Sequence, residues 1–217
     1  MKNDIQLQQD VMAELNWDPS ISSSHVGVST NDGVVTLTGH VCSYAEKWAA
    51  ERAALRVAGV KALAIEMDVE LPNSDRREDA DISRSVAHLL QQMTEIPKEG
   101  IKVMVENGWV TLFGEVEWDY QRQIASRIVR HLLGVTGVSD NIAITPKLSM
   151  NDVKDGVENA LRRRAIADID SISVMIQGED VILDGVVHSW SERELAEHAA
   201  WGMPGVHQVI NKIKVSI

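Results

Sequence analysis

The chain has 217 residues and a formal net charge of −11, with 44% hydrophobic and 24% charged residues. This composition is typical of a globular protein and excludes a disordered chain. No third of the sequence is net basic, which argues against a protein that binds nucleic acid. Cys42 is the single cysteine, so no disulfide bond forms within the chain and nothing points to an oxidising compartment.

The N-terminal segment carries Asp4, Asp10 and Glu14 and lacks the continuous apolar run of a secretory signal. No apolar stretch elsewhere is long enough to span a membrane. We therefore expect a cytoplasmic protein.

Residues 1–70 predict the order helix, strand, strand, helix, strand. Leu7, Val11 and Leu15 are spaced by four, as on the buried face of an amphipathic helix. Two alternating segments follow, joined by Asn31-Asp32-Gly33, which tolerates the positive φ of a tight hairpin. An alanine-rich helix begins at a Ser43-x-x-Glu46 capping box, and a third strand runs over residues 63–69.

The same pattern occurs twice more, which predicts three copies of one small domain. Gly39, Gly114 and Gly185 mark equivalent points, and the first helix recurs around Val86 and Val157. The second strand, second helix and third strand form a right-handed crossover. We expect an α+β chain of three tandem αββαβ sandwich domains, each a three-stranded mixed sheet with two helices on one face. The domains span 1–70, 80–145 and 151–217, joined by linkers 71–79 and 146–150.

Six recurring glycines are predicted to be structural. Gly39, Gly114 and Gly185 interrupt the second strand, where a glycine costs stability unless a helix backbone crosses closely. The other three follow the second helix, where a left-handed C-cap belongs: Gly59, Gly134 and Gly205.

The alternating strand, the block Gly-Val-Val-Thr-Leu-x-Gly-x-Val, the alanine-rich helix and the closing Gly-Val resemble the BON domain family of bacteria. This resemblance covers essentially the whole chain. It implies an α/β sandwich without catalytic activity, and a transport-associated role in attachment to phospholipid membranes under envelope or osmotic stress. Some cytoplasmic relatives bind potassium, which implies an alternative role.

The residues themselves offer no catalytic or metal-binding motif. No histidine pair has the spacing of a zinc motif, and no Cys-His-acid set recurs between the copies. We expect no catalytic residue, no metal site and no cofactor.

Basic residues recur at two positions of the second helix. A solvated helix face explains them, and the alternative is a contact with anionic lipid headgroups. The candidate lipid- or partner-binding cations are Lys47, Arg52, Arg122, Arg127 and Arg193.

The open sheet faces differ between the copies. The second copy places Met104, Trp109 and Phe113 there, and the third copy places Ile182 there. An exposed apolar patch of this kind marks an interface. Three occupants remain open: another copy within the chain, a second chain, or a lipid or small ligand.

Charged residues on the third strands suggest assembly between chains. Glu66, Asp68 and Glu70 share one face in the first copy, and Lys212 and Lys214 occupy the equivalent face in the third. Opposite charges would orient a head-to-tail homo-oligomer, while apolar residues around Trp109 or Ile182 supply affinity.

Taken together, these features predict a non-enzymatic binding protein, associated with stress or the envelope. It would contact an anionic phospholipid surface or protein partners, self-associate, and be cytoplasmic or peripheral to the membrane. The alternative is a cytoplasmic protein that binds or senses a small ligand or a cation such as potassium.

Overall fold

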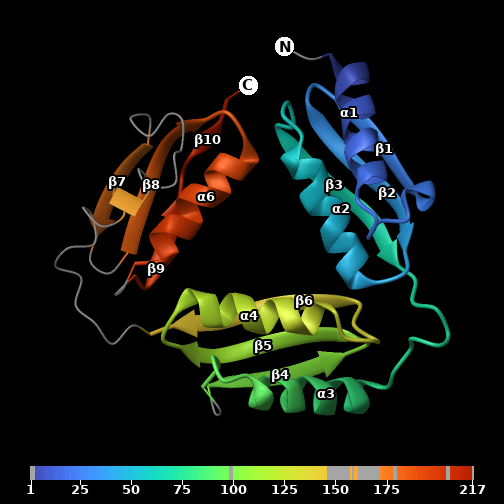
Figure 1. The fold of residues 1–217 in the computed structure, drawn as a ribbon, viewed down its shortest axis with the longest axis vertical. Coiled ribbons are helices and arrows are strands. Elements are labelled where there is room, and N and C mark those ends of the chain that lie inside the picture. Colours follow the sequence, from blue (N-terminus) through green and yellow to red (C-terminus); the bar gives the residue numbers. More distant parts are fainter. Residues whose placement is uncertain are drawn as a thin grey trace.

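A computed structural model describes residues 3–97, 100–145, 157, 159–160, 172–177, 180–203 and 206–216. Three α+β domains follow one another along the chain, each with its own mixed sheet and its own hydrophobic core. Figure 1 shows them around a common centre, with one helix of each domain turned towards that centre.

The first domain has the predicted element order. It consists of α1 (Asp4–Trp17), β1 (Val26–Asn31), β2 (Val34–Val41), α2 (Tyr44–Arg56) and β3 (Ala62–Val69), with a short 3-10 turn before β1. β2 is the central strand, antiparallel to β1 and parallel to β3. The core combines both helices with one sheet face, represented by Leu7, Ala50 and Val35.

The second domain repeats this arrangement. Its elements are α3 (Asp79–Gln92), β4 (Ile101–Glu106), β5 (Trp109–Val116), α4 (Asp119–Arg130) and β6 (Gly137–Ile144). The central strand is β5, and the helix residues Ile82, Val86 and Leu90 are buried.

The third domain is described from its first strand onwards, apart from three residues before it. Its elements are β7 (Ile172–Gln177), β8 (Asp180–Val187), α6 (Trp190–Trp201), β9 (Gln208–Asn211) and β10 (Lys214–Val215). Most of the first helix expected here lies outside the described residues, although Val157 is buried in the core. The predicted last strand is interrupted: β9 and β10 both pair in parallel with β8, and at the break the Ile213 N–H donates to Asn211 Oδ1 over 3.1 Å.

The hairpin turns of the first two domains are confirmed by their backbone angles. Asp32 and Gly33 have φ of 52° and 81°, and Asn107 and Gly108 have φ of 52° and 77°. The carboxylate of Asp4 accepts the N–H groups of Asp32 and Gly33 at 2.8 and 3.0 Å. Asp79 does the same for the second hairpin, so the first residue of each described first helix holds its hairpin turn.

The start of each second helix is fixed by a side chain in its first turn. Glu46 accepts the Cys42 N–H at 2.8 Å, and Glu192 accepts the His188 N–H at 2.8 Å. Gln121 fills this role in the second domain, where its Oε1 accepts the Trp118 N–H at 3.0 Å. These bonds set the direction of the three helices that face the centre.

The glycines of the second strands are structural for a different reason than expected. Gly39, Gly114 and Gly185 have φ of 110°, 135° and 144°. A Cβ on Gly39 would lie 2.1 Å from the carbonyl oxygen of His25, and one on Gly114 would lie 2.0 Å from that of Gly100. The expectation of a crossing helix is wrong: the close backbone is that of the residue preceding the first strand.

The glycines after the second helices adopt positive φ, as expected of a left-handed residue. Gly59 has φ of 112° and Gly134 has φ of 88°. Both lie beyond the C-cap residues, Val57 and His131, rather than next to the last helical turn. Gly205 lies outside the described residues.

Replacing Gly114 by Ala should destabilise the second domain, because the new methyl group meets a backbone carbonyl and the positive φ is strained for L-residues. We expect a loss of about 1–3 kcal/mol, measured as faster amide hydrogen exchange in β4 and β5. Gly202→Ala is the control, because its Cβ would make ordinary contacts at 3.5 Å. Unchanged exchange in Gly114→Ala would contradict this account of the glycine.

Candidate functional site

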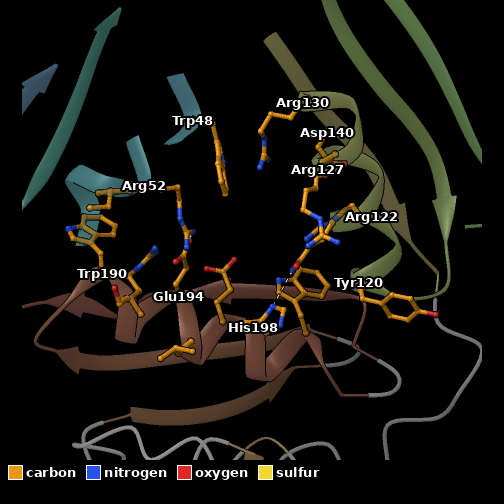
Figure 2. A pocket seen from close by; sticks show the side chains of 18 of the residues that line it. Trp48, Arg52, Tyr120, Arg122, Arg127, Arg130, Asp140, Trp190, Glu194 and His198 are labelled. Atoms are coloured by element: carbon orange, nitrogen blue, oxygen red, sulfur yellow. Dashed lines mark hydrogen bonds and ion pairs between the residues drawn. The ribbon is translucent and has the colours of Figure 1, made fainter. Parts of the chain in front are cut away.

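The three second helices line a cavity, partly open to solvent, at the centre of the molecule. α2, α4 and α6 each contribute lining residues, and the cavity has a volume of about 860 Å³ (Figure 2). That volume lies within the range of small-molecule sites. The site therefore belongs to no single domain and exists only when all three come together.

The lining of the cavity is cationic although the chain is acidic overall. It contains three carboxylates, Asp140, Glu194 and Glu197, against six arginines: Arg52, Arg56, Arg122, Arg127, Arg130 and Arg193. An excess of one sign of charge on a concave surface focuses the local potential. The cavity between the three domains thus attracts anions.

The first and second domains meet at Trp48. The guanidinium carbon of Arg130 lies 3.9 Å from the Trp48 ring centroid, and that of Arg52 lies 5.4 Å from it. In Figure 2 the Trp48 side chain projects into the cavity between these two arginines. Arg52 lies on the same helix as Trp48, so it is the Arg130–Trp48 cation–π contact that joins α2 to α4.

The second and third domains meet at Trp201. Arg122 lies over the Trp201 ring at 4.7 Å, and Gln123 Nε2 lies 3.3 Å from His198 Nδ1. Asp119 pairs with Arg122 on the same helix. Burial raises the pKa of the Asp119 carboxyl, an effect that the Arg122 guanidinium partly opposes.

The third domain returns to the first and closes the ring. Glu194 forms an ion pair with Arg52, and the Trp190 indole N–H donates to the carbonyl of Val60 at 2.7 Å. Trp190 also packs against the core of the first domain. The three domains are thus linked in a cycle within one chain.

Four of the six lining arginines have protein partners. Arg56 pairs with Glu14 and Asp18, Arg52 with Glu194, and Arg122 with Asp119. Arg193 donates to the carbonyls of Asn211 and Ile213 at 3.2 and 3.1 Å.

Arg127 and Arg130 differ from the other four. Within the described part of the chain, neither guanidinium has a hydrogen bond or an ion pair, and Arg130 Nε is buried without a hydrogen-bond partner. Burial lowers the pKa of Arg130. Arg130 stacks on Trp48 and interacts electrostatically with Glu51 of α2, so Arg127 is the more available of the two to a ligand.

The cations predicted from the sequence lie towards the ring centre rather than on an outer face. Arg52, Arg122, Arg127 and Arg193 all line the cavity. Lys47 Nζ donates to the carbonyl of Met67 at 2.6 Å, and Arg193 makes the equivalent bond in the third domain. The recurrence of these two cations is explained by this link between the second helix and the third strand, and their contact with lipid stays a prediction.

The apolar residues predicted on the open sheet of the second domain are exposed. Met104, Trp109 and Phe113 are 53%, 49% and 38% exposed, and Trp109 Nε1 donates to Ser139 Oγ at 2.9 Å. Ile182 is only 7% exposed, so it does not form an accessible patch in the third domain. The described contacts between domains involve the second helices, and the patch of Met104, Trp109 and Phe113 stays open.

The residues predicted to orient an assembly are exposed on their third strands or just beyond them. Glu66, Asp68 and Glu70 are accessible in the first domain, and Lys212 and Lys214 in the third. Contact between these groups in two chains stays a prediction.

The sequence analysis missed the residues that close the ring. Trp48, Trp190, Trp201 and Arg130 were overlooked because no copy repeats another at these positions: Trp48 aligns with Gln123 and Glu194. The available signal was the presence of large aromatic residues on the polar side of alanine-rich helices.

No group of three or more His, Cys, Asp or Glu side chains in the described part of the chain is placed to hold a metal ion. No helix of the described residues has the length and apolar character needed to cross a membrane.

The BON domain family model matches the chain three times, over residues 3–70, 78–146 and 151–216. No curated protein is significantly similar to the chain.

Among solved structures, the chain is similar to CdsD, a structural protein of the type III secretion system of Chlamydia trachomatis. The identity is 16% over 96% of this chain and 91% of that one, with a TM-score of 0.27. A structure of the CdsD C-terminal domain is also 16% identical, over 100% of both chains, with a TM-score of 0.27. The PrgH periplasmic domain gives 10% identity over 89% of this chain and 96% of that one, with a TM-score of 0.24. Superpositions this poor say nothing about the role of the chain.

Replacing Trp48 by Ala should loosen the cycle of three domains, because it removes the indole on which Arg130 of the second domain stacks. Each lost cation–π contact is worth about 0.5–2 kcal/mol. We expect a larger radius of gyration by small-angle X-ray scattering. The matched control is Trp17→Ala, since Trp17 is 85% exposed on α1. Equal radii for the two variants would show that Trp48 does not hold the domains together.

Proposed function

The chain belongs to the BON domain family through all three of its domains, and from this premise we propose that it is a non-enzymatic binding protein whose domains close around one ligand cavity. The observation that carries the proposal is the convergence of α2, α4 and α6 on one cavity lined from all three domains. Sites between domains are common places for small ligands, since each part contributes a wall.

The state of the polar groups supports binding rather than catalysis. Glu194 is paired with Arg52, and His198 lies against Gln123. The groups that would move protons in an acid–base reaction are therefore used in contacts between domains. A ligand in the cavity would touch all three domains and stabilise the closed ring by mass action.

Potassium receives less support as the ligand of this cavity. Six guanidinium groups line it against three carboxylates, and like charges repel a cation. Potassium binding elsewhere on the chain stays a prediction.

A small aromatic sulfonate, 8-anilinonaphthalene-1-sulfonate, tests whether the cavity takes a ligand. Its fluorescence should rise on binding to the wild-type protein and fall by more than about half in Ser191→Trp, because the new indole fills space from a lining position. Phe113→Ser is the control, since this dye also binds exposed apolar patches. Loss of signal in Phe113→Ser, with full signal in Ser191→Trp, would place the dye on the sheet face and contradict the proposal.

The exposed sheet face of the second domain favours a second candidate function. Met104, Trp109 and Phe113 form an apolar patch, in which a hydrogen bond to Ser139 holds the Trp109 indole in place. Such patches mark interaction surfaces. We propose that this face contacts a phospholipid surface or another copy of the chain, as a stress- or envelope-associated protein in the cytoplasm or peripheral to the membrane would.

Trp109→Ser tests this second function, because it removes the largest side chain of the patch. Wild-type protein should sediment with vesicles of anionic phospholipid at low salt, or show a mass above one chain by light scattering, and Trp109→Ser should weaken whichever is observed. Trp17→Ala serves again as the exposed control. A wild-type protein that is monomeric and does not sediment with vesicles would rule out this second function, without bearing on ligand binding in the cavity.

A further inference from the structure

The positive charge of the cavity is not balanced by its own carboxylates. Asp140 accepts the Ser126 hydroxyl at 2.7 Å and the Ile142 N–H at 3.2 Å. Glu197 accepts a hydrogen bond from Asn211 at 2.9 Å, and Glu194 is paired with Arg52. Each lining carboxylate thus has partners that do not include Arg127 or Arg130.

Arg127 and Arg130 occupy one face of α4. They are three residues apart, so their side chains are neighbours on the helix surface. Figure 2 shows both reaching from α4 to the same side of the cavity, with Arg122 below them. The buried Nε of Arg130 lacks a hydrogen-bond partner among the described residues. A buried donor without a partner costs stability, and because this nitrogen is out of reach of the cavity, a ligand would meet the terminal amino groups of Arg130 instead.

The geometry of guanidinium groups selects the chemistry of that acceptor. Arginine donates two parallel hydrogen bonds to phosphate or carboxylate oxygens, and it is the preferred residue for phosphate recognition. Two adjacent guanidinium groups fit a ligand with at least two such anionic groups. One phosphate ion would leave most of a cavity of about 860 Å³ unfilled.

The surroundings favour a soluble ligand over a lipid headgroup. The guanidinium groups lie inside the ring of three helices, whereas the apolar patch of Met104, Trp109 and Phe113 lies on the outer sheet face of the second domain. A headgroup held in a membrane plane would have to enter the ring while its acyl chains stayed outside.

We propose that the central cavity binds a soluble, multiply charged phosphate compound, held by Arg127 and Arg130 of α4 and closed in by Arg52 and Arg122. This inference rests on the proposed function, since it names the ligand class of the same cavity. The bound anion bridges α4 of the second domain to α2 of the first and so favours the closed ring.

Isothermal titration of the full chain with sodium tripolyphosphate at low salt tests the proposal. Wild-type protein should bind it, and Arg127→Gln should weaken the affinity by about tenfold or more, since it removes charge-assisted hydrogen bonds to the ligand. Arg127 has no hydrogen bond within the described structure, so this change should leave the ring intact. Orthophosphate should bind more weakly than tripolyphosphate.

The matched control is Arg84→Gln, which changes the net charge equally on the outer surface, where Arg84 pairs with Asp81. Equal weakening by the two variants would overturn the proposal, because only net charge would then matter. Unchanged affinity in Arg127→Gln would overturn it as well.

Two further measurements separate the possible failures. If tripolyphosphate does not bind while the aromatic sulfonate still occupies the cavity, the phosphate inference fails and the proposed function stands. If neither probe binds a ring that scattering shows to be closed, both fail. Sedimentation with anionic vesicles that Arg127→Gln abolishes, without tripolyphosphate binding, would identify a lipid headgroup and overturn the soluble ligand.

Discussion

The site depends on the stacking of arginines on tryptophans between the second helices, above all Arg130 of one domain on Trp48 of another. A single contact of this kind contributes only about 0.5–2 kcal/mol, too little to join separate proteins. The domains share one chain, however, and a short linker gives each domain an effective concentration of about a millimolar near its neighbour. Contacts worth about 4 kcal/mol in total correspond to a Kd of about a millimolar, so they are enough to hold linked domains together. The Arg130–Trp48 and Arg122–Trp201 contacts, the Arg52–Glu194 ion pair and the Trp190–Val60 hydrogen bond together reach about this energy, so they can close the ring.

Divergence between the copies is what makes this closure possible. Three identical second helices would place the same residue at equivalent positions, and cations would face cations. Instead, the positions aligned with Trp48 hold Gln123 and Glu194, and those aligned with Arg52 hold Arg127 and His198. Arg52 therefore meets Glu194 across one boundary, and Gln123 meets His198 across another. The fold repeats, while the face of each second helix that is turned towards the ring centre carries the differences.

The parts that could be predicted from the sequence are those governed by a local period. The spacing of Leu7, Val11 and Leu15 and the alternation around Val35 and Leu37 indicate which side chains are buried, because period and burial are coupled by backbone geometry. The cavity has no such period: it depends on contacts between residues far apart in the chain. Gly114 shows an intermediate case, since its importance was evident from recurrence but its cause, a carbonyl 2.0 Å from the missing Cβ, required the neighbouring strand.

The contrast between an acidic exterior and a cationic interior has a consequence for how the site would work. A net charge of −11 repels anions at long range, but in physiological salt that repulsion fades over about 8 Å. Within the cavity the nearest charges are the arginines, and the low-dielectric walls of three helices weaken the screening between them and a bound anion. Exposed carboxylates such as Glu66 and Asp68 therefore discourage anions from binding elsewhere on the surface, and a multiply charged ligand is retained only where Arg127 and Arg130 can form hydrogen bonds with it.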